Sequence, residues 1–83
     1  MSMTLVMVVD DEPGMLKVTE VSLLRAGYAV LTFDNPYEAL QELREGLRPD
    51  VIVSDINMPG MDGFEFYGSA REIGELRAVP FLF

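Results

Sequence analysis

The sequence contains no cysteine, no histidine and no tryptophan. Without cysteine, the 83-residue chain can form neither a disulfide nor a thiolate zinc site. Without histidine, it lacks the commonest metal ligand and the commonest general base. Any site chemistry must therefore rest on oxygen ligands, above all on carboxylates.

Positive charge is also scarce, because six Lys and Arg face fourteen Asp and Glu, for a formal net charge of −8. This balance argues against direct nucleic-acid binding by this segment and leaves no basic patch for anionic lipid. The first apolar run has no positively charged start and stops at Asp10, which is too short for a signal peptide or a membrane span. We expect a cytoplasmic protein with no membrane partner.

Four short apolar runs alternate with three helical patterns. Strands are expected at Met3 to Val9, Tyr28 to Phe33, Val51 to Val53 and Val79 to Phe83. Helices are expected from about Pro13 to Ala26, from Pro36 to a stop at Gly46, and from about Gly63 to Ile73. This order with short connections predicts one α/β domain built on a parallel sheet, with the second strand towards an edge.

Local signals at the helices add detail. Asn35 is expected to cap the second helix, with Glu38 completing a capping box, and Asp62 is expected to cap the third. In the first helix, Met15 and Val18 lie on the face predicted to be buried. Val21 and Leu24 lie on its polar side, which indicates that another element or a partner covers this flank.

Three carboxylates follow the apolar runs. Asp10 and Asp11 end the first run, and Asp55 ends the third. Parallel strands place their carboxyl ends on one rim, so these acids converge if the first and third strands are neighbours. Such a cluster repels itself unless a cation sits among the oxygens, and hard oxygen ligands favour Mg²⁺. A carboxylate beside Mg²⁺ can attack a phosphoryl group as a nucleophile.

Each acid also has an ordinary alternative. Asp10 and Asp11 could cap the helix that follows them, and Asp55 could be a solvated loop acid. The remaining aspartates are interpreted as a helix cap, Asp62, and as turn acids, Asp34 and Asp50. The combination of both acidic strand ends in one alternating pattern favours a site.

The segments VVDDEP at 8–13, NPYEAL at 35–40, PDVIVSDINMPGMDGFEF at 49–66 and VPFLF at 79–83 together resemble the receiver domain of two-component response regulators. The resemblance implies a flavodoxin-like, doubly wound fold of strand order 2-1-3-4-5, of which this chain holds the first four strands and three helices. It implies that Asp55 accepts a phosphoryl group from a histidine kinase or phosphotransfer protein. Asp11 and Asp55 would ligate Mg²⁺ directly, Asp10 mainly through a water, and Asn57 through its main-chain carbonyl. The domain would be a signalling component that regulates a downstream output, not an enzyme.

The sequence departs from the family pattern in one respect. Receivers carry a Ser or Thr at the end of the fourth strand and a Lys at the end of the fifth, and both would lie beyond Phe83. No lysine of this chain takes the equivalent place, because the only one, Lys17, is in the first helix. We therefore expect residues 1–83 to be the N-terminal part of a single receiver domain, with its output beyond residue 83. We also expect self-association through the edge of the fourth strand or, more readily, through the uncovered face of the sheet. One alternative is a degenerate receiver that acts as an unphosphorylated interaction module. A phosphatase of the haloacid dehalogenase kind is disfavoured, because Asn57 stands where that motif needs a second Asp.

Overall fold

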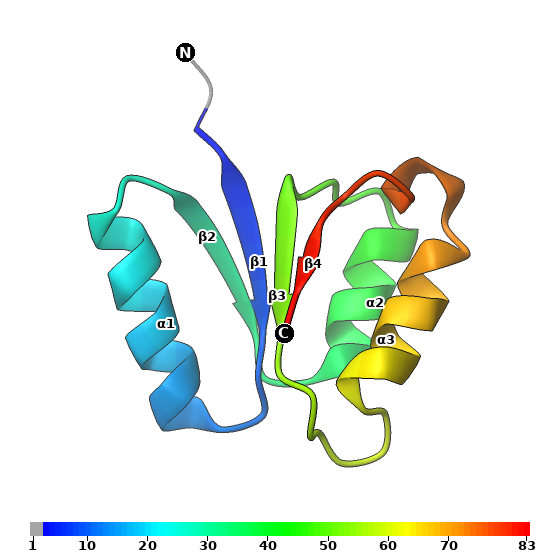
Figure 1. Ribbon diagram of the computed structural model, residues 1–83, viewed down its shortest axis with the longest axis horizontal. Helices are drawn as coiled ribbons and strands as arrows, with labels where there is room; N and C mark the ends of the chain where they lie inside the picture. The colour runs from blue at the N-terminus through cyan, green and yellow to red at the C-terminus, as the bar shows by residue number, and fades with distance from the viewer. Residues whose placement is uncertain (1–2) are drawn as a thin grey trace.

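Four parallel strands form one sheet in the order β2-β1-β3-β4 in the computed structural model, which describes residues 3–83 (Figure 1). The strands are β1 (Leu5–Val9), β2 (Ala29–Phe33), β3 (Val51–Ser54) and β4 (Phe81–Leu82). Val9 at the end of β1 pairs with Phe33 on one side and with Ser54 on the other. The order confirms the flavodoxin-like prediction, places β2 at an edge and makes β1 and β3 direct neighbours.

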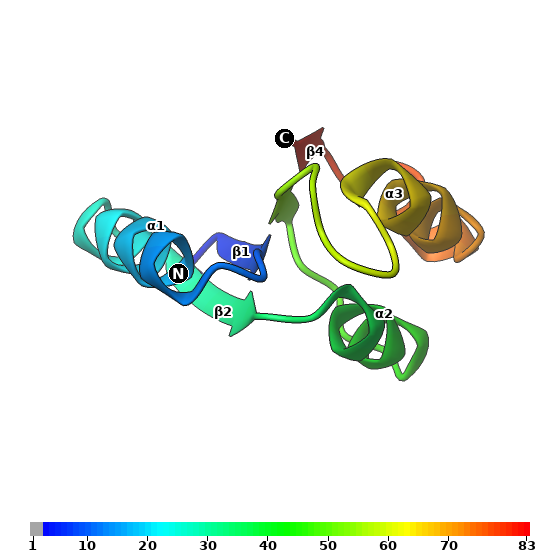
Figure 2. The same cartoon turned by 90° about the horizontal axis from the view of Figure 1, so that it is seen from below.

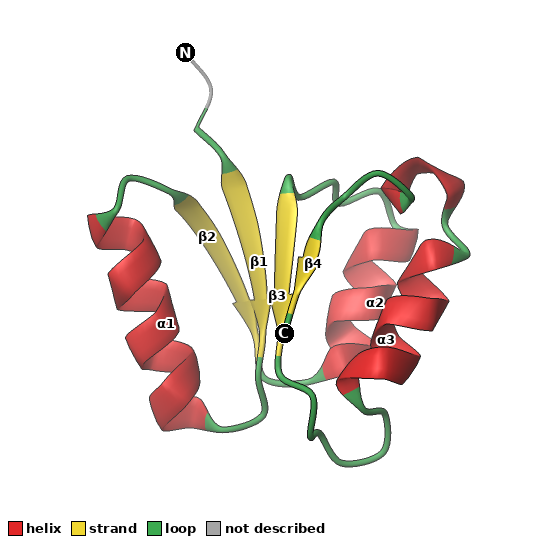
Figure 3. Ribbon diagram, viewed as in Figure 1, coloured by secondary structure: helices red, strands yellow, loops and turns green. Residues whose placement is uncertain are grey.

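Helices cover both faces of the sheet. They are α1 (Pro13–Arg25), α2 (Pro36–Arg44), α3 (Gly63–Arg71) and the short 3₁₀ helix η1 (Gly74–Leu76), drawn red in Figure 3. Seen along the strands, α1 lies on one face and α2 and α3 lie on the other (Figure 2). The third helix ends two residues earlier than expected, and η1 was not predicted.

Helix capping follows the sequence at two starts and departs from it in one detail. The Asn35 side chain accepts hydrogen bonds from the Tyr37 and Glu38 amides, and Asp62 caps α3. The capping box was expected at Glu38 but occurs at α3, where Glu65 and Asp62 bond reciprocally. Both caps have an acid three residues later, so spacing alone could not decide between them.

The core lies between the sheet and the pair α2 and α3. Ten buried residues form it: Met7, Val9, Ala39, Leu40, Leu43, Ile52, Met58, Phe66, Ala70 and Leu76. On the opposite face, Val6 and Val8 are buried on the side where α1 lies, but Val51 and Val53 are only half-buried. The prediction of a third strand buried on both faces is therefore wrong for the α1 face.

The orientation of α1 also differs from the prediction. Met15 and Val18 were expected to be buried but are 54% and 59% exposed, and none of the helix is fully buried. The half-buried positions include Leu16, Glu20 and Leu23. Apolar residues occur nearly all round this helix, so the sequence defines no single stripe strongly enough to specify the buried face.

Candidate metal centre

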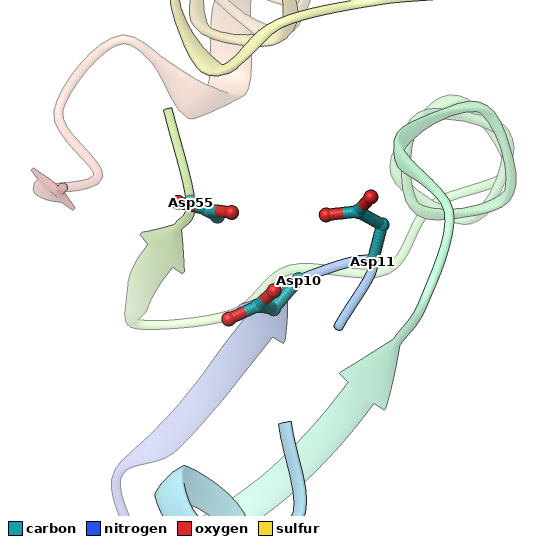
Figure 4. Close-up of side chains that lie close together, drawn as sticks. All are labelled: Asp10, Asp11 and Asp55. Carbon is teal, nitrogen blue, oxygen red and sulfur yellow. The ribbon is translucent and has the colours of Figure 1, made fainter. Parts of the chain in front are cut away.

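Asp10, Asp11 and Asp55 come together at the carboxyl rim of the sheet. Asp10 and Asp11 follow β1 and Asp55 follows β3, and one carboxylate oxygen from each lies within 4.8 Å of the others (Figure 4). In this view the carboxylates of Asp11 and Asp55 face one another across the rim. The predicted convergence of the three acids is therefore confirmed, and it depends on β1 and β3 being neighbours.

Backbone hydrogen bonds fix the acids to the sheet. The Asp55 amide donates to the Val9 carbonyl at 2.9 Å, and the Asp10 amide donates to the Phe33 carbonyl at 3.0 Å. These bonds extend the β1–β3 and β1–β2 pairings by one residue beyond the strands. The sheet therefore holds the backbone of Asp10 and Asp55 in place, although the like charges of their carboxylates repel each other.

The side chains of Asp10 and Asp55 each accept a local amide. Asp10 Oδ1 accepts from the Glu12 amide at 2.9 Å, and Asp55 Oδ1 accepts from the Ile56 amide at 2.8 Å. An ionised carboxylate has about four acceptor positions, so each group retains capacity for a cation. Both residues are half-buried, which limits competition from water without closing the site to a ligand.

The alternative in which Asp10 and Asp11 cap α1 is wrong, because Glu12 is the cap. Its two carboxylate oxygens accept from the Gly14 and Met15 amides, at 3.2 and 2.6 Å. The sequence held a signal for this role, since Pro13 at the first helical position places Glu12 at the cap. Sequence reasoning missed it because glutamate is not among the preferred capping residues.

The loop after Asp55 is anchored at several points. Met58 reaches the core with 6% exposure, and the Tyr37 hydroxyl lies 3.1 Å from where a side chain at Gly60 would begin. Gly60 has a φ of 81°, which favours glycine. Asn57 is exposed in this loop, and its role as a carbonyl ligand stays a prediction.

Two of the remaining aspartates behave differently from each other. Asp62 caps α3 as predicted. Asp50 was interpreted as a turn acid only, but its side chain accepts from the Leu5 amide at 2.7 Å. It therefore fastens the start of β1, a contact that no local pattern could predict across 45 residues.

A surface hollow of about 320 Å³ lies beside α2 and includes none of the three clustered acids. It is lined by Phe33, Tyr37, Glu38, Gln41 and Glu42. The hollow and the acidic rim are therefore distinct features, although the Phe33 carbonyl that accepts from the Asp10 amide belongs to a residue lining the hollow. Within residues 3–83, no helix combines the length and the apolar character needed to span a membrane.

Comparison with known families identifies this arrangement. The family model described as the response regulator receiver domain matches residues 6–82, which contain all three clustered acids. The chain belongs to this family. It is a receiver domain of two-component systems, as the sequence motifs indicated.

Individual relatives agree with this assignment. The transcriptional regulatory protein KdpE of Mycobacterium tuberculosis is 39% identical over 69 residues, which cover 83% of this chain and 30% of KdpE. The chemotaxis protein CheY4 of Vibrio cholerae is 38% identical with a TM-score of 0.90, over 96% of this chain and 66% of that one. The response regulator TrrA of Thermotoga maritima, solved in complex with Mg(2+)-BeF, is 37% identical with a TM-score of 0.79, over 86% of this chain and 61% of that one.

These matches bear on the alternatives. The match covers less than a third of the length of KdpE, so it concerns a part of that protein and not the whole regulator. All three acids of the cluster are present within the described residues, and nothing in their geometry supports a degenerate receiver. The three clustered acids at the carboxyl rim of the sheet are therefore the candidate functional site.

Proposed function

We propose that this receiver accepts a phosphoryl group on Asp55, in a Mg²⁺-dependent transfer from the phosphohistidine of a histidine kinase or phosphotransfer protein. The observation that carries the proposal is the convergence of Asp10, Asp11 and Asp55, whose carboxylate oxygens lie within 4.8 Å of one another. Three like charges at this separation favour a cation among them.

The ligand set fits Mg²⁺. This ion prefers hard oxygen ligands, typically one or two carboxylates completed by waters and phosphate oxygens. Asp11 and Asp55 would bind it directly, Asp10 mainly through a water, and Asn57 through its carbonyl. The complex of the related TrrA with Mg(2+)-BeF supports this chemistry for the family. When bound, the ion would neutralise charge on the transferring phosphoryl oxygens.

Asp55 would act as the nucleophile. One of its carboxylate oxygens forms the new bond to phosphorus while the phosphorus–nitrogen bond of the donor breaks, and the electron pair of that bond stays with the imidazole nitrogen. The product is an acyl phosphate on Asp55 and a free histidine on the donor. Because the Ile56 amide holds Oδ1 at 2.8 Å, Oδ2 is the oxygen left to attack.

The biological setting forms part of the same proposal. Phosphorylation of Asp55 would regulate an output domain or effector, and the domain would work in the cytoplasm as a phosphoryl acceptor and not as an enzyme. The interpretation of residues 1–83 as the N-terminal part of one receiver domain stays a prediction. It is consistent with a match that covers 66% of the CheY4 chain.

The labelling experiment uses a small-molecule phosphodonor, acetyl phosphate, with Mg²⁺ and mass spectrometry of the intact chain. We expect the wild type to gain one phosphoryl group and Asp55→Asn to gain none. Asp34→Asn is the matched control, because Asp34 follows β2 outside the acidic cluster. Equal labelling of the wild type and Asp55→Asn would remove Asp55 from this role.

Metal binding is tested separately by thermal melts with and without Mg²⁺. Preferential binding to the folded state stabilises it by about 2.7 kcal/mol at a hundredfold excess over the dissociation constant. We expect this shift in the wild type and in Asp34→Asn, and a much smaller one in Asp11→Asn. Equal shifts in all three proteins would contradict a metal site at the cluster.

A further inference from the structure

Two uncharged residues, Ser54 and Gly63, lie against the main-chain carbonyl of Asp55. The Ser54 hydroxyl donates to this carbonyl at 2.9 Å. Ser54 is only 2% exposed and is the one buried polar residue of the described chain. A buried hydroxyl requires a hydrogen-bond partner, and here the partner is the carbonyl of the peptide bond between Asp55 and Ile56.

Gly63 presses on the same peptide from the start of α3. Its amide donates to the Ile56 carbonyl at 2.8 Å. A Cβ added at Gly63 would collide with the Asp55 carbonyl oxygen and would lie 3.0 Å from the Ile56 Cα. Only glycine therefore allows α3 to begin this close to the acceptor residue.

The geometry of one peptide plane links these contacts to the carboxylate. The Asp55 carbonyl and the Ile56 amide belong to the same planar unit. Ser54 and Gly63 contact the carbonyl side of that unit. The amide side donates to Asp55 Oδ1 at 2.8 Å. Any rotation of the plane would move the hydrogen bond that orients the carboxylate.

We infer that Ser54 and Gly63 are positioning residues for Asp55, which they orient by holding the 55–56 peptide plane. The inference rests on the proposed function, since it assigns these residues to the reaction of Asp55. Neither residue touches the transferring group. They act on how often Oδ2 lies in line with the donor phosphorus.

The first test compares Ser54→Thr with Ser54→Val, which have nearly the same shape and differ in the hydroxyl. The rate of acetyl phosphate labelling is measured at saturating Mg²⁺ over a range of donor concentrations. We expect Ser54→Val to lower the maximal rate about threefold to tenfold, the worth of one hydrogen bond, with the half-saturating donor concentration unchanged. Ser54→Thr should stay within about twofold of the wild type, because it keeps the donor. If the methyl group added in Ser54→Val and Ser54→Thr prevents folding, the labelling rate of Ser54→Ala, which adds no atoms, is compared with that of the wild type instead.

The second test compares two glycines of α3. Gly63→Ala should lower the maximal labelling rate by about tenfold to a hundredfold, because the Asp55 peptide must shift to admit the methyl group. Gly68→Ala is the matched control, since a Cβ there meets nothing within 4 Å. It should label at the wild-type rate.

The outcomes separate this inference from the proposed function. If the wild type takes label only on Asp55 but Ser54→Val and Ser54→Thr label at equal rates, the inference is wrong and the proposed function stands. If the wild type and Asp55→Asn behave alike, the proposed function is wrong. The NMR chemical shift of the Ile56 amide tests separately whether Ser54 holds the peptide plane. A change from the wild-type shift in Ser54→Val but not in Ser54→Thr supports the inference, and equal shifts in the two variants overturn it.

Discussion

The two faces of the sheet differ in how completely they are buried. On the face covered by α2 and α3, Met7, Val9 and Ile52 have no exposed surface. On the face covered by α1, Val53 is half-buried and Leu82 is 56% exposed. The difference follows from the layout in Figure 2, where two helices cover one face and one helix covers the other.

The α2 and α3 side also has more polar side-chain contacts than the α1 side. The Arg71 guanidinium donates to the carbonyls of Leu76, Arg77 and Val79 and lies 4.7 Å from the centre of the Tyr67 ring. These contacts attach the segment that leads into β4 to α3. The ion pair within α1, between Lys17 and Glu20, is at the surface and contributes little to stability.

This asymmetry divides the acidic rim as well. Asp55 is held by Ser54 and Gly63, which belong to the well-packed side. Asp10 and Asp11 lead into α1, which has no buried residue. Asp55 is thus fixed by the core, whereas Asp10 and Asp11, the other two acids of the cluster, precede the more loosely packed helix. Four predictions probe the two sides of the sheet.

The largest effect is expected from removing the same atoms on the two faces. Val9→Ala deletes a fully buried side chain on the α2 and α3 face and should lower the free energy of unfolding by roughly 2–3 kcal/mol. Val53→Ala on the α1 face should cost about 1 kcal/mol, because its side chain is partly in water already. Urea unfolding measures both, and equal losses would show that the faces are equally packed.

Exposed apolar side chains on α1 predict self-association of the 83-residue chain with a second copy. Leu24 is 52% exposed on this helix and Leu82 is 56% exposed on the same face of the sheet. We expect Leu24→Glu to weaken the dimer by about tenfold to a hundredfold in dissociation constant, the worth of burying one leucine. Sedimentation over a wide concentration range measures this.

The matched control for association is Leu31→Glu, because Leu31 is 39% exposed on the other face at the edge strand β2. It should leave the dissociation constant unchanged. A wild type that stays monomeric at every concentration would show that the α1 face does not mediate association.

Intrinsic helix propensity is expected to matter at one exposed position on each side of the sheet, Gly68 and Ser22. Gly68→Ala in α3 should raise the free energy of unfolding by about 0.5–1 kcal/mol, since glycine is costly within a helix and the added methyl meets no neighbour. Ser22→Ala at an exposed position of α1 should raise it by at most about 0.5 kcal/mol. Thermal melts rank the two gains, and a larger gain at Ser22 would contradict the expectation from helix propensity.

The smallest effect concerns pH. The hydrogen bond from Arg48, followed by its charge, lowers the pKa of Glu75 below its ordinary value of 4.5. A lowered folded-state pKa means that the stabilisation is present above 4.5 and is lost as the pH falls through the folded value. Glu75→Gln should remove this dependence, whereas Glu72→Gln serves as a control on the same side. Melting temperatures on both sides of pH 4.5 measure it, and a wild-type slope retained in Glu75→Gln would contradict it.

Much of the fold could be predicted because its signals are local. Consecutive apolar residues marked β1 and β3, and Asn35 and Asp62 lie at the starts of α2 and α3 because their side chains bond amides two or three residues later. The buried face of α1 could not be predicted. Its apolar residues lie on several sides, and the sheet to which it is packed selects among them.

The sequence by itself determined which acids stand at strand ends, and so it determined Asp10, Asp11 and Asp55 as candidates. Only the tertiary structure decided that they meet, because their convergence requires β1 and β3 to be adjacent. The same holds for Gly63. It is an ordinary residue for the start of a helix, and its relation to Asp55 exists only because α3 begins against the peptide that follows Asp55. Local rules act over a few residues, whereas that contact is set by where the packing of the core places a whole helix.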